Sequence, residues 1–191
     1  MENKVICLVG YQGSGKDSIL NELVKKHGFR SYISHTSRPM RPNEAEGREY
    51  FFISKEDFLN KATNGYFIET RHYFTTVENK RSIWYYGLSK QQADKRDKPC
   101  AVILDKQGML DFAKYVGEDN VVVIYLEVDE EIAKQRAIKR GGFDEAEWNR
   151  RQKSDKKSFK GIEELSNTII NTDRKLDEIV ADVLEVYNYY N

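Results

Sequence analysis

A glycine-rich run that follows a short apolar segment limits most strongly what this chain can fold into. The run GYQGSGKDS at residues 10–18 nearly matches the pattern G-x-x-x-x-G-K-[ST] of a phosphate-binding loop. It follows the apolar residues 5–9 and opens a helical pattern, as such a loop requires. Glycines let backbone N–H groups turn toward phosphate oxygens, and the start of the helix adds its positive dipole end. The sequence therefore predicts a nucleotide-phosphate site, rather than a strand–turn–helix with incidental glycines.

Three residues of this run carry separate expectations. Lys16 is expected to reach the terminal phosphates as a point charge. Asp17 stands where the pattern has Ser or Thr, and a hydroxyl appears one position later at Ser18. Both are candidate Mg²⁺ ligands, while the alternative for Asp17 is that it only complements the dipole of the first helical turn. The residues expected around the phosphates are Gly10, Tyr11, Gln12, Gly13, Ser14, Gly15, Lys16, Asp17 and Ser18.

Apolar runs alternate with helical patterns along the rest of the chain. Short and often β-branched runs at residues 5–9, 101–104, 121–128 and 168–170 predict buried strands. Helical patterns occupy residues 18–26, 89–95, 106–115, 130–140 and 174–187. This alternation is typical of a parallel sheet with helices on both faces, so we expect a three-layer α/β core.

Two segments interrupt the alternation. Residues 34–86 are rich in aromatic and polar side chains, and predict a small mixed β subdomain with strands at 50–53 and 66–69 and a helix at 55–60. Residues 141–160 are strongly charged, follow the glycine pair Gly141-Gly142 and predict a helical lid. The core would then comprise residues 1–33, 87–140 and 161–191 of a single domain that spans residues 1–191.

Composition excludes several classes of partner. Lys+Arg and Asp+Glu number 31 each, so the totals indicate neither a nucleic acid nor a membrane as partner. Cys7 and Cys100 lie in apolar runs and are expected to be buried thiols rather than a disulfide. No apolar run approaches the ~20 residues that span a bilayer, and no targeting segment is recognisable. We expect a soluble cytoplasmic protein that is a monomer or a homodimer.

A second constellation lies in the stretch SHTSRPMRPNEAEGREYFF at residues 34–52. Arg38 and Arg41 each precede a proline, which disfavours helix and holds the two side chains on a stiff segment. Two guanidinium groups can converge on one phosphate, and Tyr50 offers a third donor. The pattern predicts a second phosphate site, whereas the alternative is a solvated basic turn.

This stretch resembles the GMP-binding signature of guanylate kinases. The matching residues are Ser34, Thr36, Arg38, Arg41, Glu44, Gly47, Tyr50 and Phe52, and the resemblance continues through GYFIE at 65–69, YGLS at 86–89 and VILD at 102–105. It implies a P-loop kinase that transfers the γ-phosphate of ATP to GMP or dGMP, with Mg²⁺, to give ADP and GDP or dGDP. Two alternatives stay open: a kinase of this type with another acceptor (another deoxynucleotide or a ribose bisphosphate), and a non-catalytic interaction module.

The resemblance also implies roles for individual residues. The residues implied at the acceptor's 5′-phosphate are Arg38, Arg41, Tyr50 and Tyr86, and those implied at the guanine edge are Ser34, Glu69 and Ser89. Asp105 would orient the acceptor or hold hydrated Mg²⁺. The lid arginines implied in catalysis beside Lys16 are Arg136, Arg140 and Arg151. Asn171 would lie on the adenine side of ATP, unless it only forms a turn.

The sequence departs from the guanylate kinase pattern in two places. The segment between Glu69 and Tyr86 is longer than the usual link, which predicts an extra hairpin with its turn near Glu78-Asn79-Lys80. After Asp105, the run Lys106-Gln107-Gly108 lacks the second aspartate of the family's D-x-D-x-Q-G. Both departures concern the base pocket rather than the phosphate chemistry.

Overall fold

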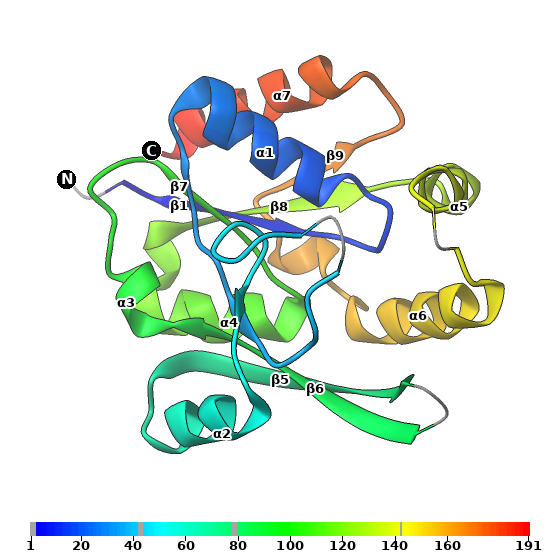
Figure 1. Cartoon of the computed structure of the whole chain (residues 1–191). Coiled ribbons are helices and arrows are strands. Elements are labelled where there is room, and N and C mark those ends of the chain that lie inside the picture. The colour runs from blue at the N-terminus through cyan, green and yellow to red at the C-terminus, as the bar shows by residue number, and fades with distance from the viewer. Residues whose placement is uncertain (1–2, 42–43, 78–79, 142) are drawn as a thin grey trace.

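A five-stranded parallel sheet forms the centre of the computed structural model, which describes residues 3–41, 44–77, 80–141 and 143–191 (Figure 1). Its strands, in spatial order, are β2 (Arg30–Ser31), β7 (Cys100–Ile103), β1 (Val5–Val9), β8 (Val121–Glu127) and β9 (Thr168–Asn171), and every neighbouring pair is parallel. The parallel sheet predicted from the four apolar runs is confirmed. The edge strand β2 was not expected, because two half-buried polar residues carry no apolar signal.

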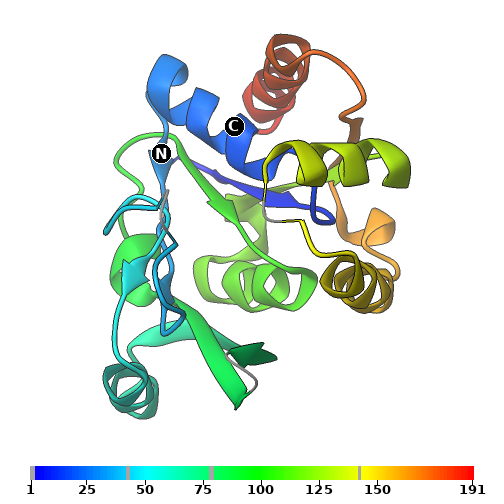
Figure 2. The ribbon, with the colours of Figure 1, turned by 45° about the vertical axis from the view of Figure 1, so that its right-hand side comes forward.

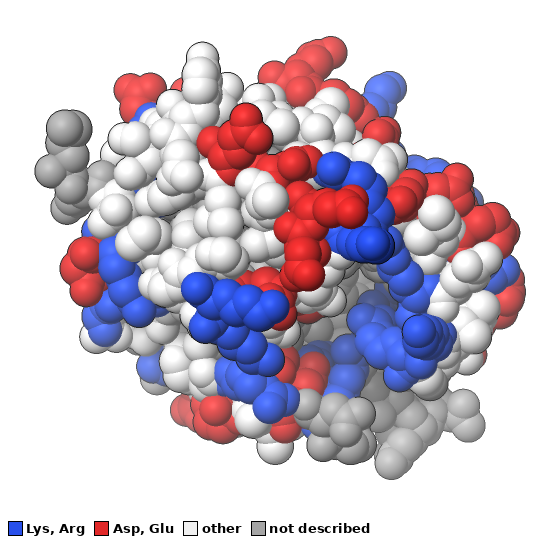
Figure 3. Space-filling model, turned by 90° about the horizontal axis from the view of Figure 1, so that it is seen from above, with Lys and Arg blue, Asp and Glu red and all other residues white. Residues whose placement is uncertain are grey.

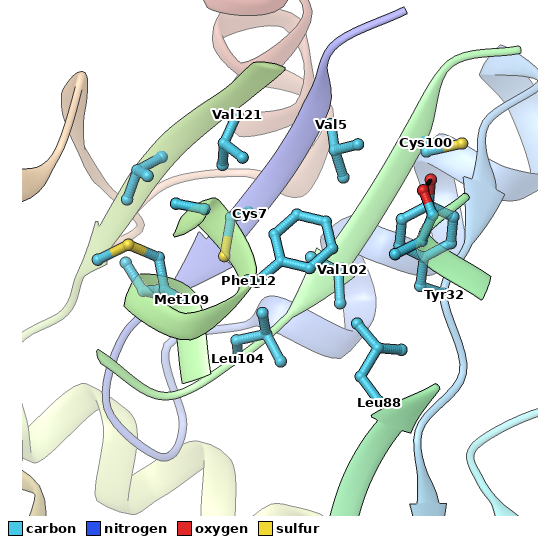
Figure 4. Packing of buried hydrophobic residues seen from close by; sticks show 14 of the residues in the cluster. Val5, Cys7, Tyr32, Leu88, Cys100, Val102, Leu104, Met109, Phe112 and Val121 are labelled. Atoms are coloured by element: carbon cyan, nitrogen blue, oxygen red, sulfur yellow. Dashed lines mark hydrogen bonds between the residues drawn. The ribbon is translucent and has the colours of Figure 1, made fainter. Parts of the chain in front are cut away.

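Helices cover both faces of this sheet, as the alternating pattern predicted. Helices α1 (Lys16–His27) and α7 (Leu176–Tyr190) lie on one face, and α4 (Lys106–Val116) lies on the other (Figures 1 and 2). Successive side chains of a strand point to opposite faces. Ile6 and Leu8 therefore join the core under α1 and α7. Cys7 packs in the opposite core with Phe112 and Met109 of α4 (Figure 4).

A second sheet, mixed and four-stranded, lies below the core in Figure 1. Its strands, in spatial order, are β4 (Phe51–Phe52), β3 (His35–Thr36), β6 (Lys80–Ser89) and β5 (Phe67–Val77). Strands β3 and β4 are parallel, whereas the other two pairs are antiparallel. Helix α2 (Lys55–Thr63) packs against this sheet, with Ser54 accepting a hydrogen bond from the N–H of Asp57 at its start. The predicted small mixed β unit is confirmed.

The long segment after Glu69 forms the predicted hairpin. Strands β5 and β6 pair continuously from Glu69 opposite Leu88 to Val77 opposite Lys80. Glu78 and Asn79, where the turn was predicted, lie outside the described residues, as do Pro42 beside Arg41 and Gly142 of the predicted hinge.

The remaining elements include the charged segment and several short connections. Helix α5 (Glu130–Lys139) follows β8, and the charged segment forms helix α6 (Glu145–Ser158), which Asp144 caps by accepting from the N–H of Glu147. The short elements are α3 (Lys90–Ala93), η1 (Glu118–Asn120) and η2 (Glu163–Leu165). No helix within the described ranges is long and apolar enough to cross a membrane. Cys7 and Cys100 are buried free thiols, as predicted.

One histidine is buried inside the small sheet. The imidazole of His35 lies 4.9 Å from the ring of Phe51 and 5.4 Å from those of Tyr66 and Phe67, and the residue is only 7% exposed. Burial, with a smaller contribution from the charge of Lys61, lowers its pKa to about 4. The imidazole is therefore neutral at neutral pH, although the same group in an unfolded chain titrates near ~6.5.

We expect His35→Phe to weaken the pH dependence of folding. As the pH falls from about 6.5 toward about 4, the unfolded chain takes up a proton that the folded imidazole refuses, so stability is lost in this window. The loss attributable to His35 is ~3 kcal/mol. Urea unfolding of both proteins across this pH range measures it, because the two proteins share every other titrating group. Parallel pH curves would contradict the prediction.

Candidate active site

The phosphate loop, residues 10–17, joins the end of β1 to the start of α1. Gly13 has a φ of +81°, and a Cβ there would come within 2.9 Å of the backbone of Ala133 on α5. Gly15, with a φ of +86°, stands at the N-cap of α1 and offers no capping side chain. The first N–H groups of the helix are therefore available to an anion, as the phosphate-loop prediction requires.

Lys16 lies folded over the loop. Its ammonium donates to the carbonyl oxygens of Gly10 and Tyr11, each at 2.7 Å, and to the hydroxyl of Ser14 at 3.2 Å. Burial lowers the pKa of Lys16 to about 8, and the positive charge of Arg140 acts in the same direction. The cation is thus held by neutral carbonyls, which it can exchange for a phosphate without leaving the loop.

Asp17 and Ser18 are both exposed in the first turn of α1. The charge of Asp17, after burial and Tyr86, contributes to raising the pKa of Tyr50 to about 12, so Asp17 lies within electrostatic reach of the small sheet. The described residues contain no group of three or more His, Cys, Asp or Glu side chains that could hold a metal by themselves. One carboxylate and one hydroxyl suit Mg²⁺ that is shared with nucleotide phosphates, which is how this ion is usually bound.

The two arginines predicted to converge on a phosphate meet at one carboxylate. The guanidinium of Arg38, which is 3% exposed, donates to Glu44 at 2.7 Å and lies over the rings of Tyr50 and Phe52. The N–H of Arg41 donates to the other oxygen of Glu44 at 2.9 Å, and its guanidinium lies 4.0 Å from that side chain. Glu44 therefore holds the pair together through both of its carboxylate oxygens.

Tyrosine rings continue this site toward β5. The ring centroids of Tyr50 and Tyr86 are 5.7 Å apart, and those of Tyr86 and Tyr73 are 5.5 Å apart. The four residues implied at the acceptor phosphate, Arg38, Arg41, Tyr50 and Tyr86, are thus brought together. Tyr73 was not among the predicted site residues.

The residues implied at the base lie further along the same strands. Glu69 is 7% exposed and accepts a hydrogen bond from the N–H of Leu88 at 3.1 Å. Ser89, at the end of β6, is 1% exposed, and Ser34 is half-buried just before β3. Asp105 caps α4 by accepting from the N–H of Gly108 at 2.6 Å. The hydroxyl of Tyr73 donates to its second oxygen at 3.1 Å.

The lid arginines have three different environments. Arg136 donates to the carbonyl oxygens of Gly13 at 3.2 Å and Thr172 at 2.6 Å, and so ties α5 to the phosphate loop. Arg140 is exposed at the end of α5. Arg151 donates to Glu147 at 2.7 Å, and its charge is among those that lower the pKa of Arg41, after burial and Arg38.

Helix α6 docks directly on the phosphate loop, which the sequence analysis did not foresee. The N–H of Gln12 donates to Asp155 at 3.2 Å, and its side-chain amide donates to the carbonyl of Trp148 at 3.1 Å. Burial raises the pKa of Asp155, while the Gln12 N–H and Lys16 oppose this rise. The sequence offers one signal for a role of Asp155 near the site, which is its position. Asp155 lies four residues after Arg151, so the two side chains share a helical face.

Asn171 ends β9 and forms a turn. Its side-chain oxygen accepts from the N–H of Asp173 at 2.8 Å, which is the turn geometry named as its alternative role.

Figure 3 shows the face above α1 and α7, where Lys and Arg side chains border a hollow and Asp and Glu side chains also reach its margin.

Three comparisons place the chain among known proteins. A family profile described as guanylate kinase matches residues 2–190. The guanylate kinase of Clostridium tetani is 31% identical over 170 residues, which are 87% of this chain and 77% of that protein. The guanylate kinase of Thermotoga maritima is 28% identical over 97% of this chain and 86% of that protein. The structure of guanylate kinase from Anaplasma phagocytophilum has a TM-score of 0.71 at 21% identity, over 98% of this chain and 86% of that chain, and shares its fold.

We expect Asp155→Asn to bind Mg·ATP, the ligand expected of a phosphate loop, about three- to tenfold more tightly than wild type, because a carboxylate beside Lys16 repels incoming phosphate charge. Isothermal titration calorimetry measures the dissociation constants. The control is Glu145→Gln on the same helix, whose carboxylate pairs with Lys134 at the surface and whose loss should leave the affinity unchanged. Equal or weaker binding by D155N would show that the carboxylate does not compete with phosphate.

Proposed function

The chain belongs to the guanylate kinase family, and on this premise we propose how its residues transfer the γ-phosphate of ATP to GMP or dGMP. One observation carries the proposal: a phosphate loop and a second site of arginines and tyrosines lie within electrostatic reach of each other. Asp17 of the loop acts on the pKa of Tyr50, and Arg151 of α6 acts on that of Arg41. The two sites suit two phosphorylated ligands bound on opposite sides of Lys16.

The donor side is formed by the phosphate loop. N–H groups at the start of α1 and around Gly13 would surround the phosphates of ATP, and Lys16 would leave its carbonyl partners to bind the terminal phosphates. Arg136 has a positioning role, because its hydrogen bonds to the carbonyl oxygens of Gly13 and Thr172 keep α5 against the loop. Asn171 is at the edge of the sheet where the adenine side of ATP would lie.

The acceptor side holds the 5′-phosphate of GMP. An arriving phosphate would take the place of Glu44 between Arg38 and Arg41. Arg38 is kept in position by the rings of Tyr50 and Phe52, so little of its conformational freedom remains to be lost on binding. The hydroxyls of Tyr50 and Tyr86 would complete the contacts.

The base is recognised by hydrogen-bond acceptors. The carboxylate of Glu69 can accept from guanine N1–H and N2–H₂, which adenine does not offer, and Ser34 and Ser89 would contact the same edge. A buried carboxylate left unpaired by the wrong base is costly, so this site rejects adenine. Asp105 would orient the acceptor beside Glu69.

Phosphoryl transfer spreads negative charge over the transferring oxygens, so catalysis depends on positioned cations rather than on a covalent nucleophile. The charge of Arg140 contributes to lowering the pKa of Lys16, and that of Arg151 to lowering the pKa of Arg41. Both arginines would stabilise the transferring charge while α6 excludes water. Bound Mg²⁺ would neutralise phosphate charge. Asp17 and Ser18, exposed in the first turn of α1, would hold it together with the nucleotide.

We expect Lys16→Ala to lower kcat for GMP phosphorylation by about 100-fold or more, because one buried cation at the transferring phosphate is lost. A coupled ADP-release assay with GMP, dGMP, AMP and other nucleotides, with and without Mg²⁺, measures this and the acceptor preference. Lys25→Ala, on the exposed side of the same helix, is the matched control. Unchanged turnover in K16A would overturn the catalytic account, and absence of any preference for guanine would overturn the acceptor.

We expect Asp17→Thr to keep activity but to change its dependence on Mg²⁺, because a neutral hydroxyl replaces a charged ligand at the start of α1. The half-maximal Mg²⁺ concentration at fixed ATP should shift by about threefold or more, since one carboxylate–cation contact is removed. An identical metal titration would leave Asp17 with only the role of a helix-start residue.

A further inference from the structure

A cation lies among the carboxylates of the proposed base pocket. Arg71 follows Glu69 by two positions on β5, so the two side chains share a face of the strand. Its guanidinium lies 3.7 Å from Glu69, 3.5 Å from Asp105 and 2.5 Å from Asp111 of α4. One side chain therefore links the strand that carries Glu69, the cap of α4 and the helix itself.

Arg71 favours the ionised form of Glu69, in which both carboxylate oxygens can accept hydrogen bonds. Burial, with the charges of Asp105 and Asp111, raises its pKa to about 7, whereas Arg71 and the N–H of Leu88 oppose the rise. A protonated Glu69 would present an O–H group to the base and lose part of its capacity to accept from guanine. Removal of Arg71 takes away the largest contribution that keeps the carboxylate charged.

Arg71 also completes the fixation of Asp105. One oxygen of Asp105 accepts from the N–H of Gly108 and faces the Nε of Arg71, and the other accepts from the hydroxyl of Tyr73. The Nε atom of Arg71 is buried and makes no hydrogen bond among the residues that the structure describes. The Nη1 and Nη2 atoms donate to the carbonyl of Thr70 at 2.7 Å and to Asp111 at 2.5 Å, whereas Nε contacts Asp105 only as an ion pair.

We propose that Arg71 is the positioning residue of the acceptor pocket: it holds Glu69 and Asp105 as two fixed carboxylate acceptors and so selects a purine with adjacent N1–H and 2-amino donors. This inference rests on the proposed GMP kinase activity and deepens it. Guanine offers both donors, hypoxanthine offers N1–H alone, and adenine offers neither at that edge. Preference for GMP over IMP is thus the property that Arg71 controls.

The first test is Arg71→Met in the full-length protein. KM for GMP should rise about tenfold or more, because an acceptor of the buried base is lost, while KM for ATP stays within about twofold. The ratio of kcat/KM for GMP to that for IMP should fall. The pH below which KM for GMP rises, near 7 in the wild type, should shift upward in R71M because Glu69 then takes up its proton at higher pH. Arg71→Lys should restore most of the loss, because it returns a cation to the same carboxylates.

Two further variants separate positioning from simple stabilisation. Asp111→Asn breaks the ion pair that ties β5 to α4 but leaves Arg71 beside Glu69 and Asp105, so it should keep the preference for GMP over IMP. Arg81→Met, an exposed arginine of β6, is the matched control. If D111N reproduces the R71M kinetics, or if R71M raises KM for ATP and GMP equally with an unchanged GMP/IMP ratio, Arg71 has only a structural role and the proposal fails.

The wild-type protein in the same assay tests the function separately. A wild type that phosphorylates another acceptor but not GMP would overturn the proposed function, and with it this inference. A wild type that phosphorylates GMP while R71M keeps its KM for GMP and its GMP/IMP ratio would overturn the inference alone.

Discussion

Repulsion among cations that are gathered for phosphate binding is the constraint on which the rest of this site depends. Carboxylates of the chain itself offset the charge of Arg38, Arg41 and Lys16. Glu44 holds the two acceptor arginines, and Asp155 lies beside the phosphate loop. Glu44 belongs to the same segment as the arginines that it holds, whereas Asp155 reaches the phosphate loop from α6.

The base pocket also balances charges, but here several carboxylates surround one cation. Here three carboxylates, Glu69, Asp105 and Asp111, surround one arginine. Buried charges are tolerated where they are paired, and each pairing also fixes an orientation. Arg38, Arg41, Glu69 and Asp105 are thus each held by a partner of opposite charge.

Much of the fold followed from local patterns. The four apolar runs became neighbouring parallel strands, and the loop at residues 10–17 formed where an apolar strand meets a helix. The arginines of the acceptor segment were also predictable as a pair, because each is held in extended backbone by a following proline. Strand β2 was not predicted, because two polar residues at a sheet edge show no periodic pattern of apolar side chains.

The sequence by itself determined the type of chemistry, because loop glycines, a lysine at a helix start and paired arginines act through residue type and short spacing. Only the tertiary structure decided which charges meet. Asp155 contacts Gln12 across 143 positions, and Arg71 contacts Asp111 across 40. Contacts at such separations depend on how helices pack on sheets, not on local propensity. From the sequence alone, an arginine on a strand is equally consistent with a solvated side chain and with a buried ion pair. The resemblance placed Glu69 at the base, but the fold placed Arg71 against it.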